Sequence, residues 1–201
     1  MAEECGVSRE TLPLLQCFAA RVEQWNPRIN LVSRHSLSDL WTRHILDSAQ
    51  LFAFRKPEAR HWVDLGSGGG FPGIVIAILA RIEMPEMRIS LVESDGRKAA
   101  FLQTVAQELD LHAAIHVKRA EALPPLGADM LSARALAPLP RLLGLADRHL
   151  ASDGRALFPK GAQHDKEVAS SLASWRFNLQ KVPSRTDRTA AILLIEGITR
   201  V

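Results

Sequence analysis

A chain of 201 residues, of which 47% are hydrophobic, can bury one core and a small appendage. Its mean hydropathy of -0.01, with no apolar run of about twenty residues, excludes an obvious membrane-spanning segment. The first residues are acidic where a signal peptide is basic, and Cys5 and Cys17 fit neither a metal site nor a disulfide framework. We therefore expect a cytoplasmic, reduced protein without metal, in which Cys17 packs inside a helical core.

The net charge of +3 is unevenly distributed. Lysine and arginine minus aspartate and glutamate gives +1 for residues 1–60, −3 for residues 61–133 and +5 for residues 134–201. A basic last third beside a mildly acidic middle favours a small-molecule site flanked by a surface for a polyanion. An ordinary arginine-rich, solvated face is the alternative.

The first 57 residues are expected to form a helical extension. Residues 8–25 have helical apolar periodicity, with Ser8 as the N-cap and Asn26-Pro27 as the end. A second helix is expected to begin at Ser36 and to bury an apolar stripe of Leu40, Trp41, Ile45, Ala49 and Phe52. His44, Asp47 and Ser48 share one flank of it, either as a surface hydrogen-bonded set or as part of a site.

From residue 58 onward, strands and helices alternate, which predicts an α/β domain with a mostly parallel sheet over residues 58–201. The expected helices span 72–81, 95–109, 139–150 and 163–172, and the expected strands span 61–63, 88–93, 114–118, 129–133 and 155–158. Two further strands, 177–182 and 190–195, follow each other without a helix and predict a closing antiparallel hairpin.

The chain from Asp64 to Gly73, DLGSGGGFPG, connects the first strand to the first helix of this domain. Its glycines allow positive φ and close approach of a ligand, and the free N–H groups of the helix start can bind an anionic or polar group. The letters fit both G-x-G-x-x-G, typical of dinucleotide sites, and D-x-G-x-G-x-G, typical of S-adenosylmethionine (AdoMet) enzymes. The loop alone leaves both cofactors open.

Glu93 ends the second strand, where a carboxylate can accept both hydroxyls of a ribose. This supports a nucleoside ligand, although an N-cap or helix-dipole role is the alternative. The closing antiparallel hairpin favours an AdoMet-dependent methyltransferase, and the chain has no room for the second domain of a dehydrogenase.

Five further stretches, together with the loop 64–73, share a pattern with one family: NLVS at 30–33, RHILDS at 43–48, RAE at 119–121, SARA at 132–135 and PKG at 159–161. In this order they resemble the RsmG (GidB) family of bacterial 16S ribosomal RNA methyltransferases, which act on N7 of guanine 527. The resemblance covers residues 28–161. It implies a Rossmann-like methyltransferase fold with a seven-stranded sheet, AdoMet as methyl donor and S-adenosylhomocysteine as product.

The loop and the resemblance together assign the cofactor site to Gly66, Ser67, Gly68, Gly70, Phe71, Glu93, Ala120, Glu121 and Arg134. Phe71 is expected at the loop tip against the ligand, whereas Trp25, Trp41 and Trp62 occupy core positions. Two residues depart from the family's pattern: Ser67 replaces a common threonine, and Arg119 stands where many AdoMet enzymes have an aspartate. Adenine is then expected to be held by backbone groups near Ala120 and Glu121.

Guanine N7 has no proton to remove, so no catalytic acid or base is expected. Positioning is assigned to His44, Asp47, Arg134 and Lys160, with a solvated lysine as the alternative for Lys160. An arginine forked onto O6 and N7 would block the attacking lone pair, so the cations are expected on O6, on phosphate or on the cofactor.

The resemblance implies 16S rRNA or the 30S subunit as partner, and RNA contacts are assigned to Asn30, Arg34, Lys160, Arg185 and Arg188. We expect a monomer. Three competing functions remain: a small-molecule AdoMet methyltransferase, a nicotinamide oxidoreductase, and an RNA-binding module with a vestigial pocket.

Overall fold

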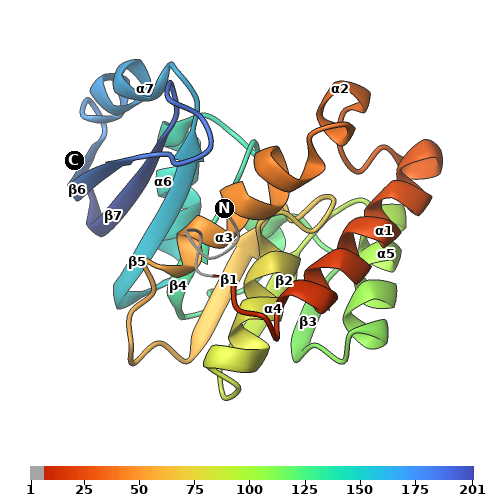
Figure 1. Cartoon of the computed structure of the whole chain (residues 1–201). Coiled ribbons are helices and arrows are strands. Elements are labelled where there is room, and N and C mark those ends of the chain that lie inside the picture. Colours follow the sequence, from red (N-terminus) through yellow and green to blue (C-terminus); the bar gives the residue numbers. More distant parts are fainter. Residues whose placement is uncertain (1–6) are drawn as a thin grey trace.

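The protein, in a computed structural model that describes residues 7–201, is built around a seven-stranded sheet (Figure 1). Residues 1–6, which include Cys5 and the acidic start, lie outside the described residues. The strands are β1 (His61–Leu65), β2 (Arg88–Val92), β3 (Ala113–His116), β4 (Ala128–Ser132), β5 (Leu150–Lys160), β6 (Trp175–Pro183) and β7 (Ala191–Arg200).

The strands pair in the order β3-β2-β1-β4-β5-β7-β6. The first five are parallel, and β7 lies antiparallel between β5 and β6. The predicted seven-stranded, mostly parallel sheet with a final antiparallel hairpin is confirmed. Strand order reverses between β1 and β4, and in open parallel sheets ligands bind at the carboxyl ends of the strands beside such a point.

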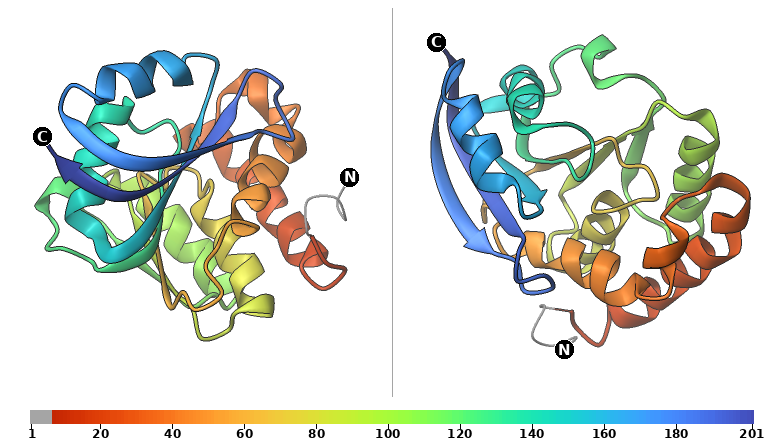
Figure 2. Two further views of the ribbon diagram at one scale, coloured as in Figure 1. Left: turned by 90° about the vertical axis from the view of Figure 1, so that its left-hand side faces the viewer. Right: turned by 90° about the horizontal axis from the view of Figure 1, so that it is seen from above.

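Helices cover both faces of the sheet. They are α1 (Leu12–Ile29), α2 (Arg34–Leu37), α3 (Asp47–Phe52), α4 (Gly73–Glu83), α5 (Gly96–Glu108), α6 (Leu139–His149) and α7 (His164–Ser171), with a π-helical segment η2 (Trp41–Leu46) and a 3-10 turn η3 (Ala120–Ala122). The view from above in Figure 2 shows α1, α3, α4 and α5 on one side of the sheet and α6 on the other. No helix within residues 7–201 combines the length and apolar character needed to cross a bilayer.

Helix α1 begins and ends four residues later than the predicted helix over residues 8–25. Ser8 caps a preceding turn, because its hydroxyl accepts the Thr11 N–H at 3.2 Å. Pro27 does not end the helix: the buried side chain of Asn26 accepts the Val32 N–H at 2.9 Å and ties the next loop to it. The helix instead ends at Asn30, which has a positive φ of 49°.

The second predicted helix is three shorter pieces, α2, η2 and α3. Ser33, not Ser36, caps the first piece, because its hydroxyl accepts the Ser36 N–H at 3.1 Å. The predicted apolar stripe is buried except at Trp41, which is half-buried. The π-helical segment widens the backbone where His44 is located, and such segments often occur at functional sites.

Cys17 is exposed, so its expected place in the helical core is wrong. Helix α1 turns Leu15, Phe18 and Val22 toward the sheet, and Cys17 falls on the opposite side of the helix. Trp62 is fully buried as expected, whereas Trp25 is half-buried. The helical residues of α1, η2 and α3 share one apolar cluster with α4, α5 and one face of the sheet, which ties residues 12–52 to the rest of the chain.

Candidate active site

The glycine loop leaves β1 and turns back over the end of β2. The Gly66 and Ser67 N–H groups both donate to the Val92 carbonyl, at 2.8 and 3.1 Å. Gly66, Gly68 and Gly70 have positive φ, and a Cβ added at Gly68 would meet no atom closer than 3.7 Å. The Gly68 side of the loop is therefore open, as a ligand-binding loop requires.

Glu93 lies against this loop. Its Oε2 accepts the Gly68 N–H at 2.8 Å and its Oε1 accepts the Asp95 N–H at 2.7 Å. Both the predicted position beside the loop and the alternative role at a helix start are thus realised, since Asp95 caps α5. Each carboxylate oxygen retains a lone pair, because an ionised carboxylate offers about four acceptor positions. Glu93 can therefore still accept ribose hydroxyls.

A cavity of about 220 Å³ opens above the loop. Five of the nine predicted cofactor residues line it: Gly66, Gly68, Glu93, Ala120 and Glu121. Arg119, Leu136 and Arg141 are among its other lining residues, and Arg141 forms an ion pair with Glu121 at 2.6 Å. We refer to this space as the cofactor cavity.

The other four predicted cofactor residues lie elsewhere. Ser67 is buried and donates its hydroxyl to the Asp64 carbonyl at 3.1 Å, and Gly70 is buried behind the loop. Phe71 is 4% exposed and packs between Phe18 and His44, with ring centroids 5.1 and 5.0 Å apart. Phe71 is thus not at an open loop tip; it supports the residues above it.

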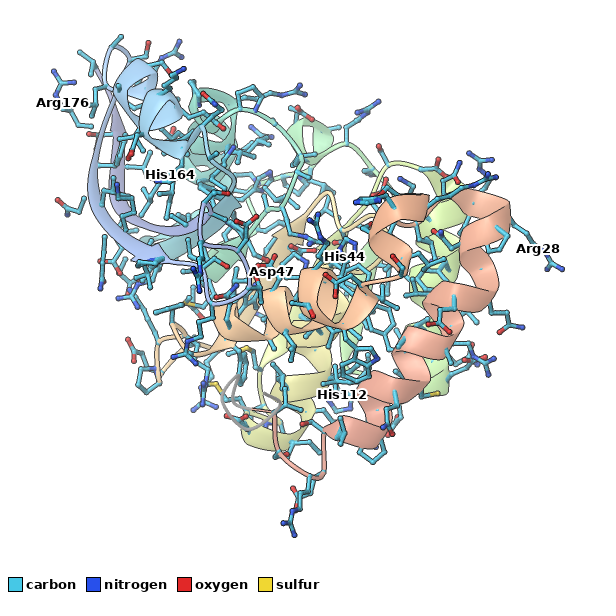
Figure 3. All side chains as sticks on the ribbon, turned by 45° about the horizontal axis from the view of Figure 1, so that its top comes forward. Arg28, His44, Asp47, His112, His164 and Arg176 are labelled. Carbon is cyan, nitrogen blue, oxygen red and sulfur yellow. The ribbon has the colours of Figure 1, made fainter. Side chains whose placement is uncertain are left out.

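Arg134 belongs to a half-buried polar cluster that joins the end of β4 to the N-terminal helices. Its guanidinium donates to His44 Nδ1 at 2.7 Å and to the Arg43 carbonyl at 3.0 Å. It also pairs with Asp47 at 3.5 Å and lies 5.4 Å from the centre of the Phe71 ring. Figure 3 shows His44 and Asp47 side by side near the centre of the molecule.

Asp47 is held by more than Arg134. Its Oδ1 accepts from Gln50 Nε2 at 2.8 Å and from the Thr186 hydroxyl at 2.7 Å. The side-chain Oε1 of Gln50 in turn accepts the Arg185 backbone N–H at 3.0 Å. These contacts fasten the loop between β6 and β7 to α3. Ser48, in contrast, is fully buried and does not join the cluster, so the predicted flank of three residues is reduced to two.

His44 is uncharged at neutral pH. Burial, followed by the cations Arg134 and Arg43, lowers the pKa of His44 from 6.5 to about 4, against an opposite effect of Asp39. Because Arg134 donates to Nδ1, the ring proton resides on Nε2. The positive charge of the cluster is therefore confined to arginine.

We expect this pKa to affect stability between pH 6.5 and 4. In that interval the unfolded chain binds a proton at His44 that the folded chain does not, so stability falls as the pH falls. His44→Gln removes this contribution. Urea unfolding at pH 7.5, 6 and 4.5 should show the wild-type free energy of unfolding falling faster with acid than that of the variant. Parallel curves would contradict the lowered pKa.

A second, larger cavity of about 590 Å³ adjoins the cluster. His44, Asp47, Arg134, Lys160 and Arg188 line it, as do Arg43 and Thr186. The solvated-lysine alternative for Lys160 is wrong: its side chain is 10% exposed, and its ammonium donates to the Ala137 carbonyl at 2.9 Å and to Glu167 at 2.8 Å. We refer to this space as the substrate cavity.

Ala135 lines both cavities. Its φ of +54° is unusual for a residue with a side chain, and such backbone conformations cluster at functional sites. The sequence contains no signal for this conformation, and Ala135 was not among the predicted site residues. It marks the place where a ligand in one cavity can meet a ligand in the other.

The remaining predicted RNA contacts lie outside the substrate cavity. Asn30 and Arg34 are exposed on either side of the loop that connects α1 to α2, and Arg185 is exposed on the loop between β6 and β7. The cluster residues Gln50 and Thr186 were missed, because the contact that joins Thr186 to Asp47 links positions more than a hundred residues apart in the sequence.

Comparison with known proteins is consistent with this geometry. The family model of rRNA small subunit methyltransferase G, GidB, matches residues 11–191. The chain is 52% identical over 198 residues to ribosomal RNA small subunit methyltransferase G of Ruegeria sp. (strain TM1040), covering 98% of this chain and 96% of that protein. The chain belongs to the GidB family. The resemblance seen in the sequence is thereby confirmed.

Solved structures agree on the fold of this GidB family member. A methyltransferase from Geobacter sulfurreducens superposes with a TM-score of 0.61 at 15% identity, covering 97% of this chain and 93% of that one. A SAM dependent methyltransferase from Aquifex aeolicus gives a TM-score of 0.58 at 12% identity, covering 78% and 92%. The Rossmann-like methyltransferase fold is confirmed.

As a GidB protein, the chain is a methyltransferase with AdoMet as methyl donor. The cofactor cavity fits this group: Gly68 leaves open space where a side chain would intrude, and the carboxylate of Glu93 faces that space with unused lone pairs.

Proposed function

We propose that this chain transfers the methyl group of AdoMet to N7 of a guanine, at the guanine 527 position of 16S ribosomal RNA. The relatives are named for the RNA of the small ribosomal subunit, which supports the class of substrate. The observation that carries the proposal is the pair of cavities that meet at Ala135: one fits a nucleoside cofactor, and the other is lined by cations.

In this proposal Gly66, Gly68, Glu93, Ala120 and Glu121 bind the cofactor, and the substrate cavity receives a guanine turned out of the RNA chain. AdoMet, when bound, supplies a methyl group on a positively charged sulfur that leaves with the electrons of the broken C–S bond. The lone pair of guanine N7 forms the new N–C bond, so no residue has to remove a proton.

The chain's own residues position the base and stabilise charge. The reaction leaves a positive charge on the guanine ring, and the Asp47 carboxylate in the wall of the substrate cavity is placed to stabilise it. His44 is neutral and therefore does not repel the positive charge that forms on the guanine ring. Lys160, which is already fixed by Glu167 and the Ala137 carbonyl, is placed to donate to O6.

RNA backbone binding is assigned to the rim. Arg188 lines the substrate cavity, Arg34 is exposed at the start of α2, and Arg185 is exposed on the loop between β6 and β7. Clustered cations bind phosphates without reading bases, so these residues would supply affinity and leave recognition to the cavity. Residues 1–57 then contribute one wall of the substrate cavity, and residues 58–201 contribute the cofactor site.

The proposal predicts that tritium from methyl-labelled AdoMet enters unmodified 16S rRNA or 30S subunits and is recovered as 7-methylguanosine. Glu93→Gln should reduce the transfer. The sharper control is RNA with 7-deazaguanosine at the target position, because this base pairs normally and lacks the N7 lone pair. Transfer to that RNA, or label in another nucleoside, would overturn the N7 assignment and leave the methyltransferase class intact.

A further inference from the structure

The 3-10 turn η3 forms one wall of the cofactor cavity, but contacts inside the turn do little to fix its position. Arg119, Ala120 and Glu121 face the cavity, and no side chain caps the turn at Arg119. A turn of three residues has little intrinsic stability. Its position must therefore come from contacts on its outer side.

Those contacts come from the last residues of α6. His149 Nε2 lies 3.0 Å from the Ala120 carbonyl oxygen, and the Arg148 guanidinium donates twice to the Leu123 carbonyl, at 3.1 and 2.6 Å. Both ends of η3 are thereby attached to the same helix. Arg141, two turns earlier on α6, pairs with Glu121 at 2.6 Å.

His149 is an unusual choice for a buried position. The residue is fully buried, and burial lowers its pKa, so the ring is neutral. Since a carbonyl can only accept, Nε2 must carry the proton and donate it to Ala120. Nδ1 then has no hydrogen-bond partner among residues 7–201, which costs free energy that a leucine would avoid. Packing alone does not explain a histidine here.

The bond to Ala120 determines which backbone groups the cavity presents. The Ala120 carbonyl accepts from His149 and from the Leu123 N–H at 3.2 Å, both inside the protein. It is therefore turned away from the ligand. Arg119, which precedes the turn and lines the cavity, has no acceptor for the amino group of adenine, so recognition falls to the backbone of the turn.

We propose that His149, assisted by Arg148, is a positioning residue that holds the Ala120–Glu121 backbone in the orientation that recognises the adenine ring of AdoMet. The proposal rests on adenine binding at η3, as assigned above. It is independent of the target base, because it concerns cofactor binding alone.

The test compares His149→Gln with His149→Leu. A glutamine amide reaches the position of Nε2 and can donate to the Ala120 carbonyl, whereas leucine packs without donating. We expect His149→Leu to weaken binding of S-adenosylhomocysteine at least tenfold in calorimetry, and His149→Gln to remain within about threefold of the wild type. In methyl transfer, KM for AdoMet should rise in the leucine variant while kcat at saturation stays nearly constant.

A second ligand separates recognition from general damage. S-inosylhomocysteine differs from S-adenosylhomocysteine only at the edge of the purine ring. The wild type should prefer the adenine compound, and His149→Leu should lose most of this preference. An equal weakening of both ligands, or equal losses in the glutamine and leucine variants, would overturn the proposal.

If His149→Leu does not fold, Arg148→Met provides a second test of the proposal. Arg148 is exposed, so methionine retains its aliphatic stem and removes only the two bonds to Leu123. We expect a smaller loss of the same adenine preference. Asp147→Asn, exposed next to it on α6, is the matched control and should bind both ligands as the wild type does. An unchanged preference in Arg148→Met beside a non-folding His149→Leu would count against the proposal.

Discussion

Arg134→Met should lower kcat/KM for methyl transfer by about a hundredfold or more and leave the affinity for S-adenosylhomocysteine within about threefold. Arg134 lines the substrate cavity, not the cofactor cavity, and connects His44, Asp47 and the Arg43 carbonyl. Methionine preserves contact with the Phe71 ring and removes these polar contacts. The base would then be held less accurately over the methyl group.

The free energy of unfolding distinguishes this loss of activity from a loss of folded protein. Removal of Arg134 leaves the half-buried Asp47 carboxylate, 17% exposed, without its cation, and this should cost more than the roughly 0–1 kcal/mol of an exposed ion pair. Adding Asp47→Asn should recover much of that free energy of unfolding without recovering activity. Arg97→Met, at an exposed ion pair, is the control and should change neither. If the double variant regained activity, the role of Arg134 would be structural only.

Gly70→Ala and Gly68→Ala should fail for different reasons, although the two residues lie in one loop. At Gly70, φ is +90°, and the new Cβ would lie 2.8 Å from Ile74 Cγ1 and 3.0 Å from Phe18 Cζ, both in the buried core. Strained φ costs about 1–2 kcal/mol and overpacking about 1–3 kcal/mol. We expect the melting temperature to drop by about 10 °C.

At Gly68, φ is +53°, but the new Cβ would meet only the Gly66 carbonyl oxygen, at 3.7 Å. The stability loss should then be about 1–2 kcal/mol, with S-adenosylhomocysteine bound at least tenfold more weakly, because the methyl group stands beside the cofactor cavity. Gly96→Ala, with no atom within 4 Å of its Cβ, should match the wild type in both measurements. Wild-type affinity in Gly68→Ala would show that the loop does not approach the cofactor.

The sequence predicted what short-range physics determines. The glycine loop and the alternation of strands and helices depend on neighbours within a few residues, and both were found where expected. Pro27 was misread as the end of the helix: it lies inside the last turn of α1, which continues to Ile29. Periodicity found the buried face of α1 but placed the helix four residues too early, and it did not show that Cys17 is exposed, because the apolar pattern does not give the width of the buried face.

The sequence predicted which residues form the site better than it predicted how those residues are arranged in space. His44 and Asp47 were chosen, but their meeting with Arg134 joins positions about ninety residues apart, which no spacing rule indicates. Phe71 was expected at the ligand and instead supports that cluster from below. His149 had no signal at all, because its role depends on one carbonyl of a turn that is remote in sequence.

The position of β7 has a consequence for synthesis of the chain on the ribosome. β7 lies between β5 and β6, although both precede it in the sequence. Until β7 has left the exit tunnel, β5 is an open edge and β6 has no partner, so a nascent chain that already holds the glycine loop and the Arg134 cluster still presents unpaired backbone to its surroundings. Completion of the sheet is therefore a late step in the synthesis of each molecule, and the chain is most exposed to aggregation before β7 pairs with β5 and β6.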